Sequence, residues 1–231
     1  MIEVRKIRGN VESVIGRMRL ASIRVGRNPD HARLLLAVKN RQPGQIEEAL
    51  SAGVRLVGEN RVQEMLAKME AVGGDVEWHF IGHLQRNKVK HVVGAVSLIH
   101  SVDSGRLALE VSRRAEQLGV VQPVLLQVNV AGEESKYGLE PEGVESMLES
   151  LADCGSIEVL GLSTIAPWVS NPEEVRWVFR DLRELGRRLE GAGAGFRCRE
   201  LSMGMTGDFE VAIEEGSTIV RVGTAVFGPV D

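Results

Sequence analysis

The stretch Arg33-Leu34-Leu35-Leu36-Ala37-Val38-Lys39 is the first strongly apolar run of the chain, and it ends on an amine. A run of this kind is typical of a strand that is buried on both faces, as in a parallel sheet covered by helices. A lysine at the mouth of such a strand is expected to be partly desolvated, which favours the neutral, nucleophilic amine. A strand-end lysine can equally extend into water. The run alone therefore leaves both interpretations of Lys39 open.

Further apolar runs follow to the end of the chain, and amphipathic segments separate them. The predicted strands are residues 34–39, 54–58, 76–82, 96–101, 123–130, 157–163, 200–203 and 218–223. The predicted helices between them are residues 45–52, 62–72, 85–93, 105–119, 142–154, 172–190 and 208–215. An amphipathic segment at about residues 3–25 predicts one additional helix at the amino terminus. No linker interrupts this alternation, so we expect a single domain over residues 1–231.

Eight strand and helix units in 231 residues favour an α/β fold, a single closed (β/α)8 barrel of the TIM type. The alternative is a doubly wound open sheet. An open sheet of that kind is expected to carry a GxGxxG turn after an early strand, and none follows Val38 or Val57. The barrel is therefore preferred.

The composition indicates small-molecule partners. With 28 basic and 32 acidic residues, the chain has no broad attraction for nucleic acid or for a membrane surface. No stretch reaches the roughly 20 apolar residues of a membrane span. Cys154 and Cys198 lie far apart without zinc-site spacing, which indicates a reducing compartment. We therefore expect a cytoplasmic protein that acts as a monomer.

Polar residues and glycines follow the last two predicted strands, and in a barrel the carboxyl ends of the strands carry the site. Ser202 belongs to the seventh strand, and Arg221, Gly223 and Thr224 belong to or follow the eighth. Glycines and hydroxyls at these positions favour a phosphate site, although they also serve ordinary turns. Because strands one and eight are neighbours in a closed barrel, a phosphorylated aldehyde bound there could reach Lys39. This combination points to pyridoxal 5'-phosphate.

Six ordered motifs resemble those of the pyridoxal phosphate homeostasis protein family, whose fold is like the amino-terminal barrel of alanine racemase. The motifs are residues 35–39, 58–64, 78–88, 129–130 with 135–138, 161–167, and 201–228. The resemblance covers nearly the whole chain. It implies six cofactor-binding residues, which are Lys39, Asn60, Ser202, Arg221, Gly223 and Thr224.

The resemblance also implies a role for each of these residues. Lys39 would carry the internal aldimine of pyridoxal phosphate. Ser202, Gly223 and Thr224 would hold the phosphate. Arg221 would face the pyridine nitrogen, and Asn60 would line the pocket near the ring.

One departure from the family pattern concerns Lys39. The family usually has a serine or threonine between the valine and the lysine, whereas Lys39 follows Val38 directly. Alignment backwards from Pro43 would place Asn40 at the lysine position and would abolish the aldimine. Lys39 lies fourteen residues before Gly53, which is the family's usual separation and favours Lys39. The missing residue then lies inside the first strand. Its loss reverses the face on which the preceding side chains lie, unless relatives have a bulge there that this chain lacks.

These features predict a carrier of the cofactor rather than an enzyme. An arginine beside the pyridine nitrogen keeps that nitrogen unprotonated and weakens the cofactor as an electron sink. Racemases of similar barrel type use a second acid/base, a tyrosine from another domain, whereas this chain has only Tyr137, which we expect to pack locally. We therefore expect a protein that holds pyridoxal phosphate as a reversible aldimine and supplies it to apo-enzymes.

Two enzymatic alternatives stay open. The first is a small pyridoxal phosphate-dependent amino-acid racemase or lyase. The second is a sugar-phosphate barrel enzyme that uses Lys39 as an aldolase-type amine, although no paired carboxylates accompany it. His79 and His83 lie four residues apart without an evident third ligand, so no metal site is expected.

Overall fold

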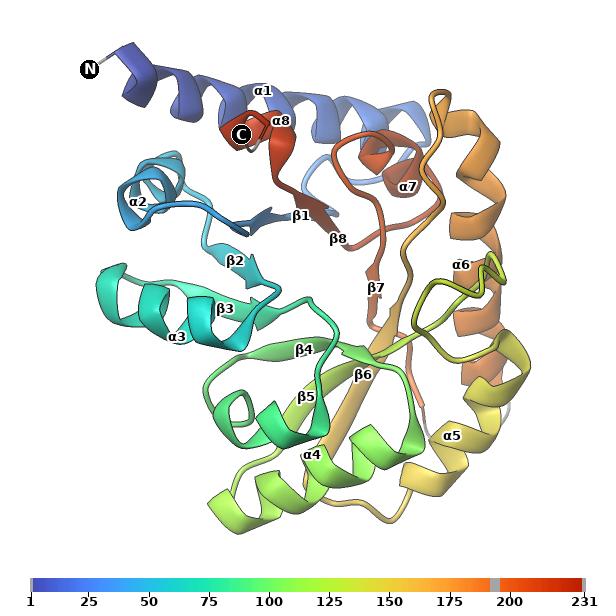
Figure 1. Cartoon of the computed structure of the whole chain (residues 1–231). Coiled ribbons are helices and arrows are strands. Elements are labelled where there is room, and N and C mark those ends of the chain that lie inside the picture. Colours follow the sequence, from blue (N-terminus) through green and yellow to red (C-terminus); the bar gives the residue numbers. More distant parts are fainter. Residues whose placement is uncertain (1, 192–195, 230–231) are drawn as a thin grey trace.

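Eight parallel strands close into a barrel in the order β1 to β8, which confirms the predicted fold (Figure 1). The computed structural model describes residues 2–191 and 196–229. The strands are β1 (Arg33–Ala37), β2 (Leu56–Glu59), β3 (Glu77–Phe80), β4 (Leu98–Val102), β5 (Gln122–Gln127), β6 (Ile157–Ser163), β7 (Glu200–Ser202) and β8 (Ile219–Val222). All of these strands overlap the predicted runs.

Helices connect the strands on the outside of the barrel (Figure 1). The α-helices are α1 (Ile2–Arg24), α2 (Pro43–Ser51), α3 (Val62–Ala71), α4 (Gly105–Leu118), α5 (Val144–Leu151), α6 (Arg176–Gly191), α7 (Phe209–Glu214) and α8 (Thr224–Phe227). The described residues also form the short 3-10 helices η1 (Arg86–His91), η2 (Pro141–Gly143) and η3 (Pro172–Val175). Among the residues described, no helix is both long enough and apolar enough to cross a membrane.

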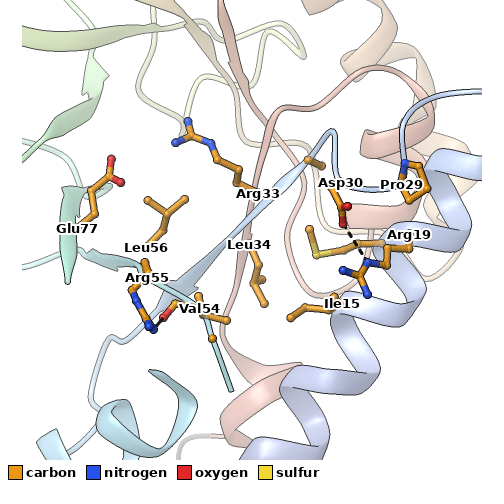
Figure 2. A pocket seen from close by; sticks show the side chains of 13 residues that line it. Ile15, Arg19, Pro29, Asp30, Arg33, Leu34, Val54, Arg55, Leu56 and Glu77 are labelled. Atoms are coloured by element: carbon orange, nitrogen blue, oxygen red, sulfur yellow. Dashed lines mark hydrogen bonds and ion pairs between the residues drawn. The ribbon is translucent and has the colours of Figure 1, made fainter. Parts of the chain in front are cut away.

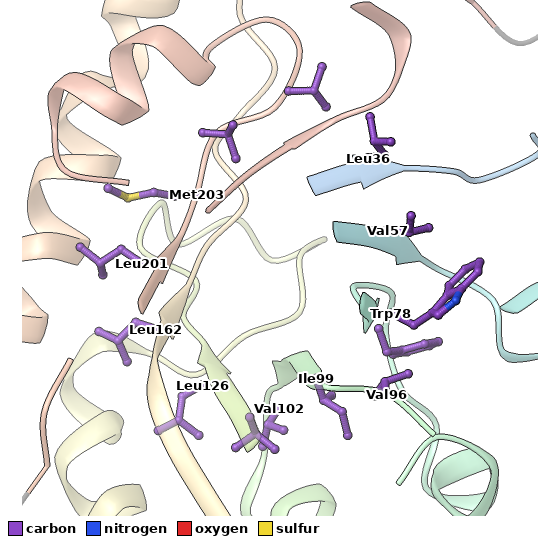
Figure 3. Packing of buried hydrophobic residues seen from close by; sticks show 14 of the residues in the cluster. Leu36, Val57, Trp78, Val96, Ile99, Val102, Leu126, Leu162, Leu201 and Met203 are labelled. Atoms are coloured by element: carbon purple, nitrogen blue, oxygen red, sulfur yellow. The ribbon is translucent and has the colours of Figure 1, made fainter. Parts of the chain in front are cut away.

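Alternation along the strands separates two cores. One small cluster is formed by inward-facing side chains, which are Leu35, Leu56, Leu98, Leu125 and Ile219. The intervening strand residues face the helices and belong to a much larger outer cluster, part of which is drawn in Figure 3. Each fully buried leucine or isoleucine stabilises the fold by about 1.5–3 kcal/mol. Burial on both faces explains why β1 has no polar alternation.

The predicted amino-terminal helix is α1, and its apolar side packs against the outside of the barrel. Val11, Val14, Met18 and Ala21 are buried at helical spacing. Ion pairs join α1 to α7, because Arg17 Nε lies 3.1 Å from Glu210 Oε1 and Arg24 Nε lies 2.7 Å from Glu214 Oε1. In Figure 1 the helix lies across α8 and α7, beside the strands that open and close the barrel.

Two parts of the helix prediction were wrong. Within the predicted helix at residues 85–93, Arg86–His91 form the 3-10 helix η1 rather than an α-helix, and Val89 is its buried residue. The short helix α8 was not predicted, because the glycines that flank it at Gly223 and Gly228 indicate a turn.

Candidate functional site

A cavity of about 670 Å³ lies at the carboxyl ends of the strands. It brings together most of the predicted cofactor-binding residues, which are Lys39, Asn60, Arg221, Gly223 and Thr224. Ser202 is not among the lining residues and is fully buried. Side chains far apart in the sequence therefore meet where the barrel fold predicts that they meet.

Lys39 reaches this cavity because β1 is regular. β1 pairs with β8 without a register shift from Arg33 opposite Ile219 to Leu36 opposite Val222. Leu35 faces the barrel interior, and the alternation carries Ala37 and Lys39 to the same side, where both line the cavity. β1 thus contains no bulge where it pairs with β8. The expected partial desolvation of Lys39 was wrong, because the residue is exposed at the cavity wall.

A buried ion-pair cluster holds the turn that carries Lys39. Lys68 Nζ donates to the Val38 carbonyl oxygen at 2.8 Å and to Glu64 Oε2 at 3.1 Å. It also donates to Glu59, whose side chain is fully buried. Glu64 Oε2 in turn accepts from the Asn40 amide at 3.3 Å. Backbone groups on both sides of the lysine are therefore fixed by α3, and we name Lys68, Glu59 and Glu64 the clamp.

Asn40 follows Lys39 in the left-handed region, with φ of 58°, and it also lines the cavity. Asparagine tolerates this conformation better than most residues, whereas a lysine there would be strained. The left-handed backbone at position 40 thus favours asparagine there and the lysine at position 39.

Asn60 is fixed through its backbone. Glu59 Oε2 accepts hydrogen bonds from the amides of Asn60 and of Arg61, the latter at 3.1 Å. On the other side, the chain after β3 passes so close that a Cβ at Gly82 would lie 2.1 Å from the Asn60 carbonyl oxygen. Only glycine at position 82 permits this approach.

Arg221 is the buried cation of the site. Its Nη1 donates to the Ser202 carbonyl oxygen at 2.7 Å and to Ser202 Oγ at 2.6 Å, and its Nη2 donates to the Thr164 carbonyl oxygen at 2.7 Å. Burial lowers the pKa of Arg221 to about 10, so it stays charged at neutral pH. A guanidinium has five N–H donors, so Arg221 keeps donors for a ligand in the cavity. Burial also raises the pKa of Asp208, a second lining residue.

The loops after β7 and β8 are tied together at the cavity. Thr206 Oγ1 accepts from the Ala225 amide at 3.3 Å, which joins the β7 loop to the start of α8. A Cβ at Gly223 would lie 3.0 Å from the Ala37 carbonyl oxygen, so the close approach of β8 to β1 leaves little room for a side chain there. Thr206 also lines the cavity, although it was not among the predicted cofactor-binding residues.

Other lining residues were missed as well. Trp168 is 92% exposed and lies in the cavity wall, directly after the motif that ends at Pro167. Ile165 and Met205 are also lining residues with partial exposure. The position of Trp168 behind a strand-end motif was the available signal.

Tyr137 packs locally rather than over the cavity. Its ring stacks on His83 at a centroid distance of 3.7 Å and an interplanar angle of 13°. His83 Nδ1 lies 3.0 Å from Asp103 Oδ2. None of these three residues lines the cavity. Within residues 2–191 and 196–229, no group of three or more His, Cys, Asp or Glu residues could hold a metal ion.

A (β/α)8 barrel with a lysine, a buried arginine and glycine turns at one cavity is the class of domain found at the amino terminus of alanine racemase. The family model "Alanine racemase, N-terminal domain" matches residues 19–231. The pyridoxal phosphate homeostasis protein of Aquifex aeolicus is 50% identical over 93% of this chain and 94% of its own. The chain belongs to the family of pyridoxal phosphate homeostasis proteins.

Solved structures agree with this assignment. A protein described as unknown from Bifidobacterium adolescentis has a TM-score of 0.91 and 42% identity, over 98% of this chain and 96% of that one. PipY of Synechococcus elongatus PCC7942, with PLP bound, has a TM-score of 0.80 and 36% identity, over 92% of this chain and 99% of that one.

Proposed function

We propose that this protein binds pyridoxal 5'-phosphate in the cavity at the carboxyl ends of the strands and serves intracellular homeostasis of that cofactor. The supporting observation is that Lys39, Arg221 and the turn at Gly223 line one cavity. The relatives named for this role and the PLP-bound structure of PipY support the same ligand. The glycine and hydroxyl residues in the loops after β7 and β8 suit a phosphate group. The buried guanidinium of Arg221 suits the ring nitrogen, which accepts a hydrogen bond.

The residues of the cavity suggest how the ligand is oriented. Lys39 would supply the amine that holds the aldehyde of the cofactor. Arg221 would donate to the pyridine nitrogen and, because it remains charged, would disfavour its protonation. Gly223 and Thr224 would hold the phosphate, and Asn60 would lie near the ring.

We revise the phosphate role of Ser202. Its hydroxyl lies outside the cavity wall and contacts Arg221, whereas the Thr206 hydroxyl lies in the wall. We therefore assign Thr206 to the phosphate, and Ser202 to support of the arginine.

The role that we propose is delivery without turnover, in which the protein supplies the cofactor to apo-enzymes. A racemase or lyase needs a second acid/base on the opposite face of the substrate. The stacking of Tyr137 on His83 keeps the chain's single tyrosine away from the cavity wall, which supports the carrier. Two unpaired cysteines, Cys154 and Cys198, support a cytoplasmic location.

Borohydride trapping tests the lysine assignment. Protein incubated with pyridoxal phosphate is reduced with sodium borohydride, and its peptides are mapped by mass spectrometry. The modified residue is expected to be Lys39, and Lys39→Ala protein should lose both the modification and the absorbance band near the visible. Lys90→Ala, an exposed lysine on η1, is the matched control and should keep both. A modification that persists in Lys39→Ala protein would show that another amine holds the cofactor.

Deuterium exchange separates the carrier from the enzyme. The loaded protein is incubated in D2O with a panel of amino acids, and α-proton exchange is followed by NMR. No exchange is expected. Exchange that disappears in Lys39→Ala protein would establish the racemase or lyase instead.

A further inference from the structure

A continuous series of hydrogen bonds crosses the barrel interior below the cavity. Arg221 Nη1 lies 2.6 Å from Ser202 Oγ, which lies 2.8 Å from His100 Nδ1. His100 Nε2 lies 2.9 Å from His79 Nδ1, and His79 Nε2 lies 3.0 Å from Glu77 Oε1. We name Ser202, His100, His79 and Glu77 the relay. It connects β8, β7, β4 and β3 through the centre of the fold.

With Glu77 ionised and both imidazoles neutral, only one arrangement of protons satisfies every bond of the relay. The carboxylate of Glu77 can only accept and Arg221 can only donate, so Ser202 Oγ accepts from Arg221 and donates its own hydrogen to His100 Nδ1. His100 then carries its proton on Nε2 and donates to His79 Nδ1. His79 likewise carries its proton on Nε2 and donates to the carboxylate of Glu77. All donors therefore point from the cavity towards Glu77.

The electrostatics of the relay agree with a neutral His100 between a cation and an anion. His79, His100 and Ser202 are buried. Burial above all, and then the positive charge of Arg221, lowers the pKa of His100 well below its usual value. The hydrogen bond from His79 lowers the pKa of Glu77, so the far end of the relay is ionised at neutral pH.

The relay ends at the opposite face of the barrel. Glu77 lines a second cavity of about 360 Å³, near the amino ends of β1 and β2. Figure 2 shows Glu77 on β3 beside Leu56, its partner in β2, with Arg33 and Arg55 also in view. A partly exposed carboxylate on one face of the barrel is thus joined by four hydrogen bonds to the arginine of the other face.

We propose that the relay positions Arg221 and couples its donor strength to the carboxylate of Glu77. No member of the relay lines the cavity, so the relay acts through the guanidinium. Successive hydrogen bonds that point the same way polarise one another. The relay therefore holds Arg221 in one orientation and transmits part of the negative charge of Glu77 to it.

Imidazole NMR tests the arrangement without any cofactor. Long-range 1H–15N spectra of the labelled protein, assigned with His79→Gln and His100→Gln proteins, report which ring nitrogen carries the proton. Both His79 and His100 should be neutral with the proton on Nε2 at neutral pH. A proton on Nδ1 of either ring, or an imidazolium, would overturn the relay as described.

A double-mutant cycle tests the coupling, and this arm rests on the proposed binding of pyridoxal phosphate. Ser202→Ala should weaken binding about tenfold, the value of one hydrogen bond to a charged group. Glu77→Gln keeps an acceptor but removes the charge, and should weaken binding about threefold. The double variant should bind like Ser202→Ala alone, because the relay is already cut.

Glu158→Gln is the matched control, since Glu158 is a partly exposed carboxylate near the start of β6, outside the relay. It should leave binding unchanged. If the effects of Ser202→Ala and Glu77→Gln multiply to about thirtyfold, the two residues act independently and the coupling is refuted. If the wild-type protein binds no pyridoxal phosphate, the proposed function fails, and the NMR result alone decides whether the relay exists.

Discussion

Replacing Lys68 by methionine removes the cation of the clamp while keeping an unbranched apolar side chain of similar length. Three contacts are lost together, which are those to the Val38 carbonyl oxygen at 2.8 Å, to Glu64 at 3.1 Å and to Glu59. Because Glu59 is fully buried, its carboxylate would keep only the two backbone amides of Asn60 and Arg61 as partners. Water therefore cannot replace the lost ammonium as a partner of the Glu59 carboxylate.

The expected cost follows from that burial. Removing one partner of a buried ion pair costs about 3–5 kcal/mol, mostly because the other charge is left without compensation. The free energy of unfolding of a domain is typically about 5–15 kcal/mol, so this loss would be a large share of the total. With an m-value of about 2 kcal/mol per molar urea, the unfolding midpoint should fall by about 2 M.

Urea unfolding followed by circular dichroism measures this change, and two further variants interpret it. Lys68→Met with Glu59→Gln replaces the stranded charge by a neutral amide that still accepts from the Asn60 amide, so the loss should shrink to about 1–2 kcal/mol. Lys90→Met, at an exposed lysine, should change the free energy by less than about 0.5 kcal/mol.

The reasoning fails if Lys68→Met protein loses less than about 1 kcal/mol, or if the double variant is less stable than the single one. Either result would mean that Glu59 finds solvent or another partner once the ammonium is gone. The same proteins also report on the site, because the clamp holds the backbone on both sides of Lys39. Borohydride trapping at Lys39 should therefore fall in Lys68→Met protein under conditions where the protein is still folded.

Three further substitutions test the packing and the protonation of the barrel. Gly82→Ala places a Cβ 2.1 Å from the Asn60 carbonyl oxygen and should cost at least about 2 kcal/mol in urea unfolding. Gly44→Ala in α2 meets nothing within 4 Å and should instead stabilise by about 0.5–1 kcal/mol. His100 has a lowered pKa in the fold, so the unfolded chain takes up its proton first, and the free energy of unfolding should fall by about 1 kcal/mol from pH 6.5 to 5.5. His100→Gln protein should lack this part of the pH dependence, and an equal slope in both proteins would contradict a neutral, buried His100.

The residues that meet at the carboxyl ends of the strands could be predicted from the sequence, because a single rule of the barrel fold places them. Side chains at the carboxyl ends of neighbouring parallel strands meet at the same rim. Lys39, Arg221 and Gly223 obey this rule directly, since β1 and β8 are adjacent and pair without a shift. For residues of this kind, the order of the strands decides the contacts, and side-chain detail matters little.

The depth at which a side chain lies inside the barrel, such as that of Ser202, could not be predicted in the same way. Ser202 pairs with Ile219, which lies two residues before Arg221, or about 6.6 Å earlier along the strand. A hydroxyl at that level lies below the rim and contacts the arginine from beneath. Placing it requires the register between β7 and β8, which a three-residue strand does not reveal.

The relay lay beyond sequence reasoning for a related reason. His79 and His100 are buried in strands rich in apolar residues, so each resembles a histidine packed in a core. Their meeting depends on the register of β3 against β4, where His79 pairs with Leu98 rather than with His100. Only the diagonal approach of the two rings, with centroids 5.0 Å apart, shows that they are partners.

The direct succession of Val38 and Lys39 can be compared with the way in which β1 presents the lysine. In a regular strand, side chains point alternately into the barrel and towards the helices, so one inward-facing residue fixes the direction of all the others. In β1 that residue is Leu35. Lys39 then points to the cavity because it lies an even number of residues beyond Leu35. An inserted residue in the same strand would turn the lysine towards the helices unless a bulge absorbed it. A lysine directly after Val38 therefore suits a strand without a bulge. The hydrogen bond from Lys68 to the Val38 carbonyl oxygen holds the backbone in this arrangement.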